Sequence, residues 1–240
     1  MTGNGLEGKS DVIRYAQLLA TSGLTHGTSG NVSVRSKNGF LITPSGIPYE
    51  DLTENLIVEM SLDGGYWGDT LPSSEWQMHR DVYRSYPDAT AVIHCHSARA
   101  TALSCLRRSI PAFHYMVAAA GGKSIECAEY ATFGTKALSE AMLAALGPRR
   151  ACLLANHGQI AFGASLYRAF ALAVEVEALA DQYMSALSIG EPAILSQEEM
   201  DRILAKFRSY GKQLDELSDD APDAFEHPRH LGASDTKGGL

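Results

Sequence analysis

Two histidines in the stretch "AVIHCHS" at residues 91–97 are the first residues whose types and spacing indicate chemistry. They stand one residue apart at the end of an apolar run that is typical of a buried strand. Side chains alternate between the two faces of a strand, so His94 and His96 share a face and can point at a common spot. Because histidine is the commonest metal ligand, the pair predicts either a metal site or two hydrogen-bonded imidazoles.

A third histidine favours the metal site. The stretch "ACLLANHGQIA" predicts a second buried strand that ends in the polar turn Asn156-His157-Gly158. Three imidazoles and one open coordination position are the arrangement of a catalytic zinc site and not of a closed structural one. Ligands that are carried by strands also have the fixed geometry that such a site needs.

The remaining histidines are weaker candidates as metal ligands. His79 follows Glu75 by four residues, so both lie on one face of a predicted helix. This spacing allows a metal pair, but it favours a hydrogen bond on the helix surface or in the shell around the metal site. The others that we do not expect to ligate are His26, His114, His227 and His230.

Three short loops that are rich in hydroxyl groups and glycine predict a phosphate site. They are "GTSGN" at 27–31, "TPSG" at 43–46 and "PSSE" at 72–75. Backbone N–H groups, Ser and Asn side chains and a helix start can bind phosphate without Lys or Arg. Each loop alone resembles an ordinary turn, and the helix dipole alone accounts for a glutamate at position 75. Their occurrence together, beside a candidate metal triad, favours a site.

The elements that must position these residues alternate irregularly between helix and strand. Hairpin signals such as "SKNG" favour a mixed or largely antiparallel sheet with helices packed around it, which is the α/β class. Expected caps are Ser10 or Asp11, a serine of "PSS", and Thr135, and we expect a capping box of Ser196 with Glu199. Helices are predicted at 9–23, 72–88, 98–105, 131–150, 165–190 and 196–211, and strands at 31–35, 39–43, 55–67, 90–97 and 151–163.

Composition limits the classes of function. The chain has 240 residues, is 45% hydrophobic and has a net charge of −8, which argues against nucleic acid as a partner. No apolar run approaches the roughly 18–20 residues of a membrane span, and the polar start has no signal-peptide core. The cysteines, which form no CxxC pair, are expected to be reduced in a cytoplasmic protein; they are Cys95, Cys105, Cys127 and Cys152.

Over residues 6–217 the sequence resembles the class II, zinc-dependent aldolases, a family that also includes ribulose-phosphate epimerases and the adducin head domain. The likeness is closest to the L-fuculose-phosphate aldolase branch. We therefore expect a class II aldolase domain at 1–217 and a polar, flexible tail at 218–240. The stretches that carry the resemblance are "GTSGNVSVR", "ITPSGIPYEDL", "LPSSEWQMH", "AVIHCHS", "SIPAFHYMVAAAGG", "YATFGT", "NHGQIA" and "KFRSYG".

The resemblance implies a role for each site residue. One Zn²⁺ per subunit, or alternatively Mn²⁺ or Co²⁺, would be held by His94, His96 and His157. Glu75 would be the catalytic acid/base and a further ligand in the resting state. Two tyrosines would complete the site, Tyr115 from a neighbouring subunit and Tyr210 from the C-terminal segment. The residues that match the phosphate pocket are Gly30, Asn31, Ser45, Gly46, Ser73 and Ser74.

The resemblance also implies a fold and an assembly. The fold would be a three-layer α/β/α sandwich with a mixed, mainly antiparallel central sheet. The assembly would be a homotetramer with fourfold rotation and active sites at subunit interfaces. Asn156 and Cys95, which adjoin the predicted ligands, depart from the family pattern and leave the surroundings of the metal open.

The implied reaction is metal-dependent retro-aldol cleavage of a ketose 1-phosphate. The first-choice substrate is L-fuculose 1-phosphate, which would give dihydroxyacetone phosphate and lactaldehyde. 5-Deoxyribulose or 5-methylthioribulose 1-phosphate are alternatives, since only the far end of the sugar differs. Glu75 would protonate C3, and Tyr115 would hydrogen-bond the oxygen that becomes the aldehyde.

Other functions stay open at this point. A sugar-phosphate 4-epimerase, a dehydratase or a decarboxylase would use the same scaffold, but the related epimerases carry Asp where Glu75 stands. An adducin-like module without activity would lack the metal ligands that are present here. A Schiff-base aldolase is disfavoured because neither Lys123 nor Lys136 lies in an apolar run that would lower its pKa.

Overall fold

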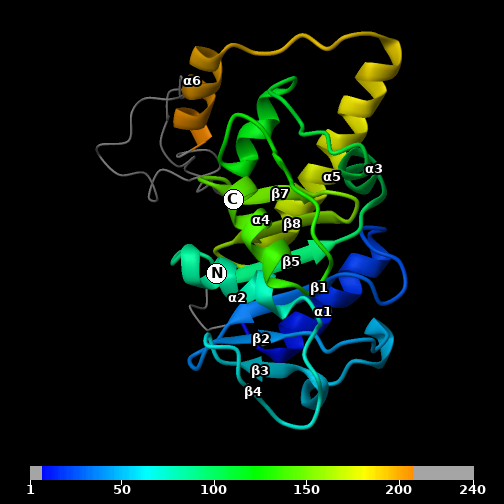
Figure 1. The fold of residues 1–240 in the computed structure, drawn as a ribbon, viewed down its shortest axis with the longest axis vertical. Helices are drawn as coiled ribbons and strands as arrows, with labels where there is room; N and C mark the ends of the chain where they lie inside the picture. Colours follow the sequence, from blue (N-terminus) through cyan, green and yellow to red (C-terminus); the bar gives the residue numbers. More distant parts are fainter. Residues whose placement is uncertain (1–6, 208–240) are drawn as a thin grey trace, which may run out of the picture.

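A computed structural model describes residues 7–207 and places one eight-stranded sheet at the centre of the molecule (Figure 1). The strand order is β4-β3-β2-β1-β5-β8-β7-β6, and only the β6–β7 pair is parallel. The predicted mixed, mainly antiparallel sheet is therefore confirmed. The strands are β1 (Asn31–Arg35), β2 (Phe40–Ile42), β3 (Val58–Met60), β4 (Tyr66–Trp67), β5 (Ala91–Cys95), β6 (Cys127–Ala128), β7 (Ala151–Leu154) and β8 (Gly158–Gly163).

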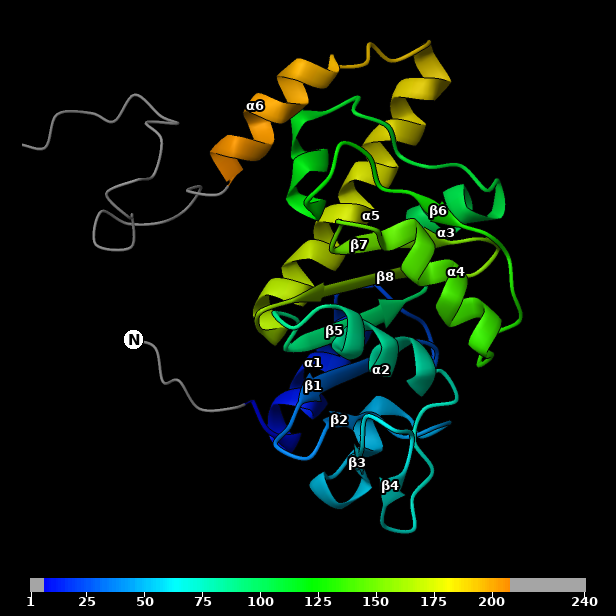
Figure 2. The same cartoon turned by 60° about the vertical axis from the view of Figure 1, so that its left-hand side comes forward.

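Helices cover both faces of this sheet. Figure 2 shows α2 and α4 in front of the strands and α1 and α5 behind them. One buried apolar cluster lies between the sheet and α1, α3 and α5, and a second lies between the sheet and α2 and α4. The three-layer α/β/α sandwich is thus confirmed. The helices are α1 (Lys9–Thr21), α2 (Trp76–Ser85), α3 (Ala98–Cys105), α4 (Lys136–Leu146), α5 (Leu166–Ile189) and α6 (Gln197–Phe207), with short 3-10 turns η1 (Tyr49–Asp51), η2 (Glu54–Leu56) and η3 (Tyr115–Ala120).

Strand β5 shows why an apolar run becomes a central strand. Its residues are all buried, and they alternate between the two cores. Val92 packs against the α2–α4 side, whereas Ile93 and Cys95 pack against the α1–α3–α5 side. Because both faces bury apolar area, this strand is fixed at the centre of the molecule.

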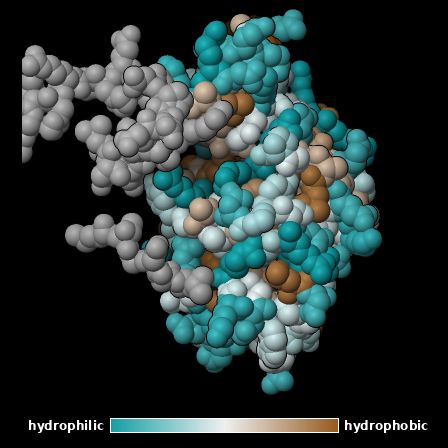
Figure 3. All heavy atoms as spheres, turned by 90° about the vertical axis from the view of Figure 1, so that its left-hand side faces the viewer, coloured by the Kyte–Doolittle hydropathy of each residue, from teal (hydrophilic) through white to brown (hydrophobic). Residues whose placement is uncertain are grey.

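The outer surface that is visible in Figure 3 is largely hydrophilic, with small separate hydrophobic patches.

The β1–β2 hairpin brings the glycine- and hydroxyl-rich loop 27–31 to the end of β5. Its turn requires glycine at position 39, where φ is +153° and a Cβ atom would lie 2.1 Å from the carbonyl oxygen of Met60. On its other edge β1 pairs with β5, and Asn31 stands directly opposite His94. The loop 27–31 therefore ends beside the strand that carries the paired histidines.

The helix caps confirm some predictions and correct others. Thr135 and Ser196 accept hydrogen bonds from the backbone N–H three residues later, as predicted, but the Glu199 carboxylate of the expected capping box accepts from Arg202 instead. Helix α1 instead begins after Gly8, and the Asp11 carboxylate accepts from the Gly8 N–H at 3.0 Å, so neither Ser10 nor Asp11 occupies the cap position. Helix α2 begins after Glu75 and not after a serine, because the preceding serines lie in the bend that lines the site described below.

All four cysteines are free, as expected. Within residues 7–207, no helix combines the length and apolar character needed to cross a bilayer. The proposed tail at 218–240 lies outside the described residues.

Candidate active site

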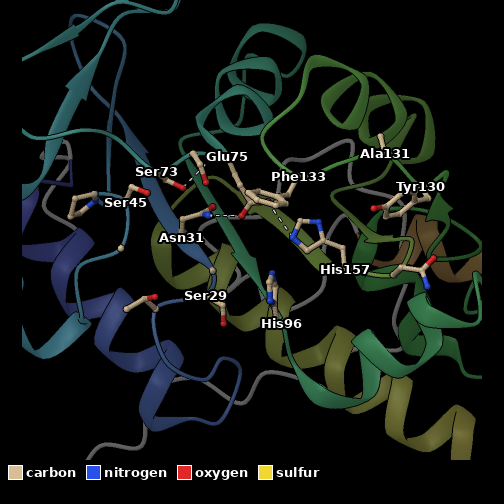
Figure 4. Close-up of a pocket in the computed structure, with 16 residues that line it drawn as sticks. Ser29, Asn31, Ser45, Ser73, Glu75, His96, Tyr130, Ala131, Phe133 and His157 are labelled. Atoms are coloured by element: carbon tan, nitrogen blue, oxygen red, sulfur yellow. Dashed lines mark hydrogen bonds and ion pairs between the residues drawn. The ribbon is translucent and has the colours of Figure 1, made fainter.

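Glu75, His94, His96 and His157 converge on one point. One ligand atom from each of the four lies within 4.8 Å of the others. His94 is on β5, His96 directly follows that strand, His157 lies in the turn between β7 and β8, and Glu75 precedes α2. Figure 4 shows Glu75, His96 and His157 facing one another across the pocket.

The close approach of the two histidine-bearing segments depends on Gly158. A Cβ atom at this position would lie 2.5 Å from the carbonyl oxygen of Cys95 and 3.0 Å from the ring of His96. Asn156, which is two residues before Gly158, adopts the left-handed conformation with φ of +55°, and asparagine tolerates this better than most residues. This tight turn gives a conformational reason for asparagine at position 156.

The orientation of His94 is fixed by a backbone carbonyl. Its Nδ1 donates to the carbonyl oxygen of Gln159 at 2.8 Å, so the lone pair of neutral His94 is on Nε2, facing the cluster. That Nε2 lies 3.0 Å from Nε2 of His96 and 3.2 Å from Oε2 of Glu75. The three imidazole rings meet edge to face, with centroids 4.8–4.9 Å apart.

The cluster shifts the protonation of its own members. Burial and the neighbouring His94 and His157 lower the pKa of His96 to about 4, so the ring is neutral and offers a nitrogen lone pair for metal ligation. Burial raises the pKa of Glu75, but the charge of His94 and the close approach of the His157 and His94 rings outweigh it and hold that pKa below its ordinary value. Burial lowers the pKa of His94, while the Glu75 carboxylate raises it by more. The carboxylate is therefore ionised.

These residues fit a divalent cation. The Nε2 atoms of His94 and His96 face each other at 3.0 Å, an arrangement that a shared cation stabilises. The buried Oε1 of Glu75 accepts no hydrogen bond and lies 3.2 Å from Nε2 of His157. Three imidazole nitrogens with one carboxylate oxygen are the ligands that catalytic zinc and related ions prefer.

A cavity of about 410 Å³ adjoins the cluster. All six residues predicted for the phosphate pocket line it, and so do three members of the cluster. The described residues that line the cavity include neither Lys nor Arg, so an anion there would be bound by hydroxyl, amide and backbone N–H groups. The lining consists of Thr28, Ser29, Gly30, Asn31, Pro44, Ser45, Gly46, Ser73, Ser74, Glu75, His96, Tyr130, Ala131, Phe133, Asn156 and His157.

The loop 27–31 is held against the sheet by a buried tyrosine. The hydroxyl of Tyr49 lies 2.9 Å from the carbonyl oxygen of Ser29 and 2.8 Å from that of Gly30. Burial raises the pKa of Tyr49, so the hydroxyl keeps its proton and donates. Gly30 has φ of +89°, and a Cβ atom there would lie 2.8 Å from the carbonyl oxygen of His94. A side chain at position 30 would thus push the loop away from β5.

His79 is not one of the converging residues. It is fully buried in the core, and its ring contacts Ser33 at 2.6 Å and Asn31 at 2.5 Å. Asn31 in turn donates to Oε2 of Glu75 at 3.0 Å. The helix spacing favoured a hydrogen bond either on the helix surface or in the shell around the metal site. The surface position is wrong, because His79 is buried and contacts Asn31, which in turn contacts Glu75.

Tyr115, the one predicted tyrosine within the described residues, does not line this cavity in its own chain. Tyr115 begins η3, is 50% exposed and stacks on His114. Tyr210 lies outside the described residues.

Sequence reasoning missed several residues that line the cavity. Tyr130 and Phe133 are exposed aromatic side chains in the loop before α4, and their exposure became evident only in the fold. That loop is held close by Gly134, where a Cβ atom would lie 2.9 Å from the carbonyl oxygen of Ser74. Exposed aromatic residues beside a cavity contribute apolar contact area for a ligand.

The fold and the site together define an α/β protein equipped to hold a divalent cation beside a pocket for a small anion. Comparisons with known proteins narrow this class. The profile of the class II aldolase and adducin N-terminal domain family matches residues 10–184. A 5-methylthioribulose-1-phosphate/5-deoxyribulose-1-phosphate aldolase of Rhodospirillum rubrum is 51% identical over 211 residues, which cover 88% of this chain and 96% of that protein.

Two further relatives agree. An L-fuculose phosphate aldolase of Escherichia coli K12 is 54% identical over 195 residues, which cover 81% of this chain and 91% of the relative. A solved structure of L-fuculose 1-phosphate aldolase superposes with a TM-score of 0.81 at 44% identity, and the match covers 86% of this chain and all of that one. The chain belongs to the class II aldolase and adducin N-terminal domain family.

Proposed function

We propose that this protein is an aldehyde-lyase that cleaves a ketose 1-phosphate into dihydroxyacetone phosphate and a short aldehyde. The observation that carries the proposal is the convergence of Glu75 and three histidines beside a neutral, hydroxyl-rich cavity. The names of the relatives support it, since they describe aldolases acting on L-fuculose phosphate and on 5-methylthioribulose or 5-deoxyribulose 1-phosphate.

His94, His96 and His157 would hold the divalent cation, for which zinc is our first choice and manganese or cobalt the alternatives. When bound, such a cation supplies Lewis-acid stabilisation of the negative charge that develops as the carbon–carbon bond breaks. The hydrogen bond from Nδ1 of His94 to Gln159 supports this assignment, because it sets the ring orientation that ligation needs.

The remaining residues would bind the substrate and transfer its protons. Backbone and side-chain donors around Gly30, Ser45 and Ser73 would bind the phosphate and so fix the position of the sugar carbons. Cleavage would start when the ionised Glu75 carboxylate takes the proton of the C4 hydroxyl; the C3–C4 bond then breaks, which forms the aldehyde carbonyl and leaves the electron pair of the bond at C3. Glu75 is 7% exposed and is ionised before reaction, so it would act as the group that holds a proton and returns it to C3.

The aldehyde half would lie on the side of the cavity that carries Tyr130 and Phe133. In Figure 4 the labelled serines stand on one side of the cluster and Tyr130 on the other. An aromatic border favours an apolar end such as a methyl or methylthio group. This feature accommodates both lactaldehyde and the aldehyde products of the deoxy and methylthio sugars.

We further propose a cytoplasmic homotetramer with its active sites at subunit interfaces. The half-exposed position of Tyr115, outside the cavity of its own chain, supports a role in the site of a neighbouring copy. The four free cysteines support a reducing compartment. Tyr210 would help to close the same site.

The alternatives are less well supported. An epimerase, a dehydratase or a decarboxylase would use the same cation, but Glu75 and the aldolase relatives favour cleavage. An inert adducin-like module has no need of a convergent donor set. Lys123 pairs with Asp201 and Lys136 with Glu140, and neither lines the cavity, so a Schiff base with substrate is disfavoured.

The test is a panel of ketose 1-phosphates assayed for dihydroxyacetone phosphate by a coupled enzyme. The panel holds the 1-phosphates of L-fuculose, 5-deoxyribulose and 5-methylthioribulose, each with and without a chelator, and the metal content of the protein is measured in parallel. We expect chelator-sensitive release of dihydroxyacetone phosphate from at least one of them. Conversion of a sugar phosphate to its epimer, or no turnover by metal-loaded protein, would contradict the proposal.

A further inference from the structure

A continuous chain of hydrogen bonds connects the Glu75 carboxylate to the protein core. The hydroxyl of Tyr83 lies 2.7 Å from Oγ of Ser33, and that Oγ lies 2.6 Å from Nδ1 of His79. Nε2 of His79 lies 2.5 Å from Oδ1 of Asn31, and Nδ2 of Asn31 donates to Oε2 of Glu75 at 3.0 Å. All five residues are buried, so water does not compete for these bonds.

The direction of each bond follows from its neighbour, beginning at the carboxylate. Ionised Glu75 can only accept, which makes the amide nitrogen of Asn31 face it. The amide oxygen of Asn31 is then turned toward His79 and requires a proton on Nε2. The site geometry thus assigns the tautomer of a histidine that does not itself contact the cluster.

The other half of the chain obeys the same logic. Burial lowers the pKa of His79 to about 3, so the ring is neutral and its Nδ1 is an acceptor. Ser33 therefore donates to Nδ1, and Ser33 accepts from Tyr83, whose pKa burial raises. Every hydrogen bond in the chain donates toward Glu75.

Two rigid elements carry the whole chain. Asn31 and Ser33 are alternate residues of β1 and so point to the same face of the sheet. Glu75 and His79 are four residues apart, at the start and on the first turn of α2, and Tyr83 is one turn further. The chain therefore bonds one side of α2 to one face of β1, directly behind the carboxylate.

We propose that His79 is a positioning residue, which acts through Asn31 to hold the Glu75 carboxylate in one orientation toward the substrate. This inference rests on the proposed acid/base role of Glu75. The carboxylate needs such a support because its other oxygen, Oε1, accepts no hydrogen bond and only faces His157. Without the Asn31 contact, the carboxylate is oriented only by its 3.2 Å approaches to His94 and His157, and it keeps no hydrogen bond to the sheet.

Two substitutions of His79 separate positioning from mere packing. In His79→Gln the side-chain amide can place a donor near the position of Nε2 and so retain the contact with Asn31. In His79→Asn the amide lies near the position of Nδ1, which retains the contact with Ser33 but does not reach Asn31. Both replacements are polar and uncharged, and they differ in size by only one methylene, a difference that thermal unfolding of both variants measures separately.

We expect His79→Asn to lower kcat by about 10–100-fold, the usual effect of a displaced supporting group. We expect the KM for the ketose phosphate and the metal stoichiometry to change by less than about twofold, because neither the cavity nor the ligands are altered. His79→Gln should retain kcat within about threefold of the unsubstituted protein, as a preserved hydrogen bond implies. Equal loss in both variants would reduce His79 to a packing role and overturn the inference.

A second measurement does not depend on activity. The ring ¹⁵N chemical shifts of His79, measured in metal-free and in zinc-loaded protein, should report the neutral tautomer with its proton on Nε2. Ser33→Ala removes the donor to Nδ1 while leaving His79 and Asn31 in place, so the ring is less firmly held; it should lower kcat several-fold while the proton stays on Nε2. This variant serves as the kinetic test if His79→Asn does not fold.

The outcomes distinguish this inference from the proposed function. An Nδ1-protonated ring in the unsubstituted protein, or full kcat in both His79→Asn and Ser33→Ala, would overturn the positioning role while cleavage of ketose phosphates stands. Absence of cleavage by the unsubstituted, metal-loaded protein would overturn the proposed function, and the tautomer would still be read from the spectrum.

Discussion

Glu75→Gln is the substitution that most directly tests the chemistry of the site. Glutamine has the size and shape of glutamate, and its side-chain oxygen can still accept from Nδ2 of Asn31, now 3.0 Å from Oε2. Its amide group would then face His157, whose Nε2 lies 3.2 Å from Oε1. The buried hydrogen bonds are thus preserved, and the free energy of unfolding should change by less than about 1 kcal/mol per bond affected.

Activity should respond very differently. A glutamine amide cannot take up or return a proton, and loss of a general acid/base lowers kcat by about 10²–10⁴-fold. This corresponds to about 3–5 kcal/mol of barrier at 1.36 kcal/mol per factor of ten. The three histidines remain, so we expect metal content to stay near that of the unsubstituted protein.

The assay follows dihydroxyacetone phosphate release under saturating substrate, together with metal analysis and thermal unfolding of the same preparation. Glu140→Gln is the matched control, because Glu140 is on the surface of α4 and pairs with Lys136 of the same helix. The control should retain full activity. Unchanged kcat in Glu75→Gln would refute the acid/base role, and a loss of metal in proportion to activity would show that Glu75 acts as a ligand instead.

Further predictions concern the metal, the backbone and the pH. Dialysis against a chelator should abolish cleavage, and added zinc, manganese or cobalt should restore it in a rate assay. Gly158→Ala should lower the free energy of unfolding by about 1–3 kcal/mol, because its Cβ atom would overlap the end of β5; urea titration and metal analysis would check this. Tyr49→Phe removes the donor to the carbonyls of Ser29 and Gly30 and should raise KM for the ketose phosphate about 2–10-fold with kcat nearly unchanged in steady-state kinetics. Burial lowers the pKa of His79 from its ordinary value near 6.5 to about 3, so the unfolded chain binds more protons between these pH values and the free energy of unfolding falls as pH drops through them. The fall between pH 7 and 5, measured by urea unfolding, should be smaller in His79→Gln.

Periodicity and turn chemistry were sufficient to predict most elements of the fold. The long apolar face of α5 and the capping threonine of α4 are local signals, and both helices lie where expected. The predicted start of α2 was wrong because two serines before a helix resemble a helix cap in the sequence. In the structure Glu75 occupies the cap position and its side chain faces the histidines, so tertiary contacts override the local preference.

Part of the site could also be predicted from local sequence signals. Residues at strand ends, such as His94 and His157, are brought together by any sheet that pairs β5 with β8, and histidine spacing reveals them. The hydrogen-bond chain behind Glu75 could not be predicted from the sequence, because it depends on how α2 packs on β1. The role proposed for Tyr115 would depend on a second copy of the chain, which the spacing of one sequence does not locate.

The direct pairing of Asn31 with His94 has a consequence for the length of ligand that the site accepts. Opposed residues of antiparallel strands have Cα atoms about 4.5–5.5 Å apart, and the ladder of backbone hydrogen bonds keeps that interval constant. The turn proposed to bind the phosphate and the strand proposed to hold the cation are therefore at a fixed distance from each other. In that binding mode, a sugar phosphorylated one carbon further along its chain would place its oxygens away from the cation, so the sheet would discriminate between positional isomers.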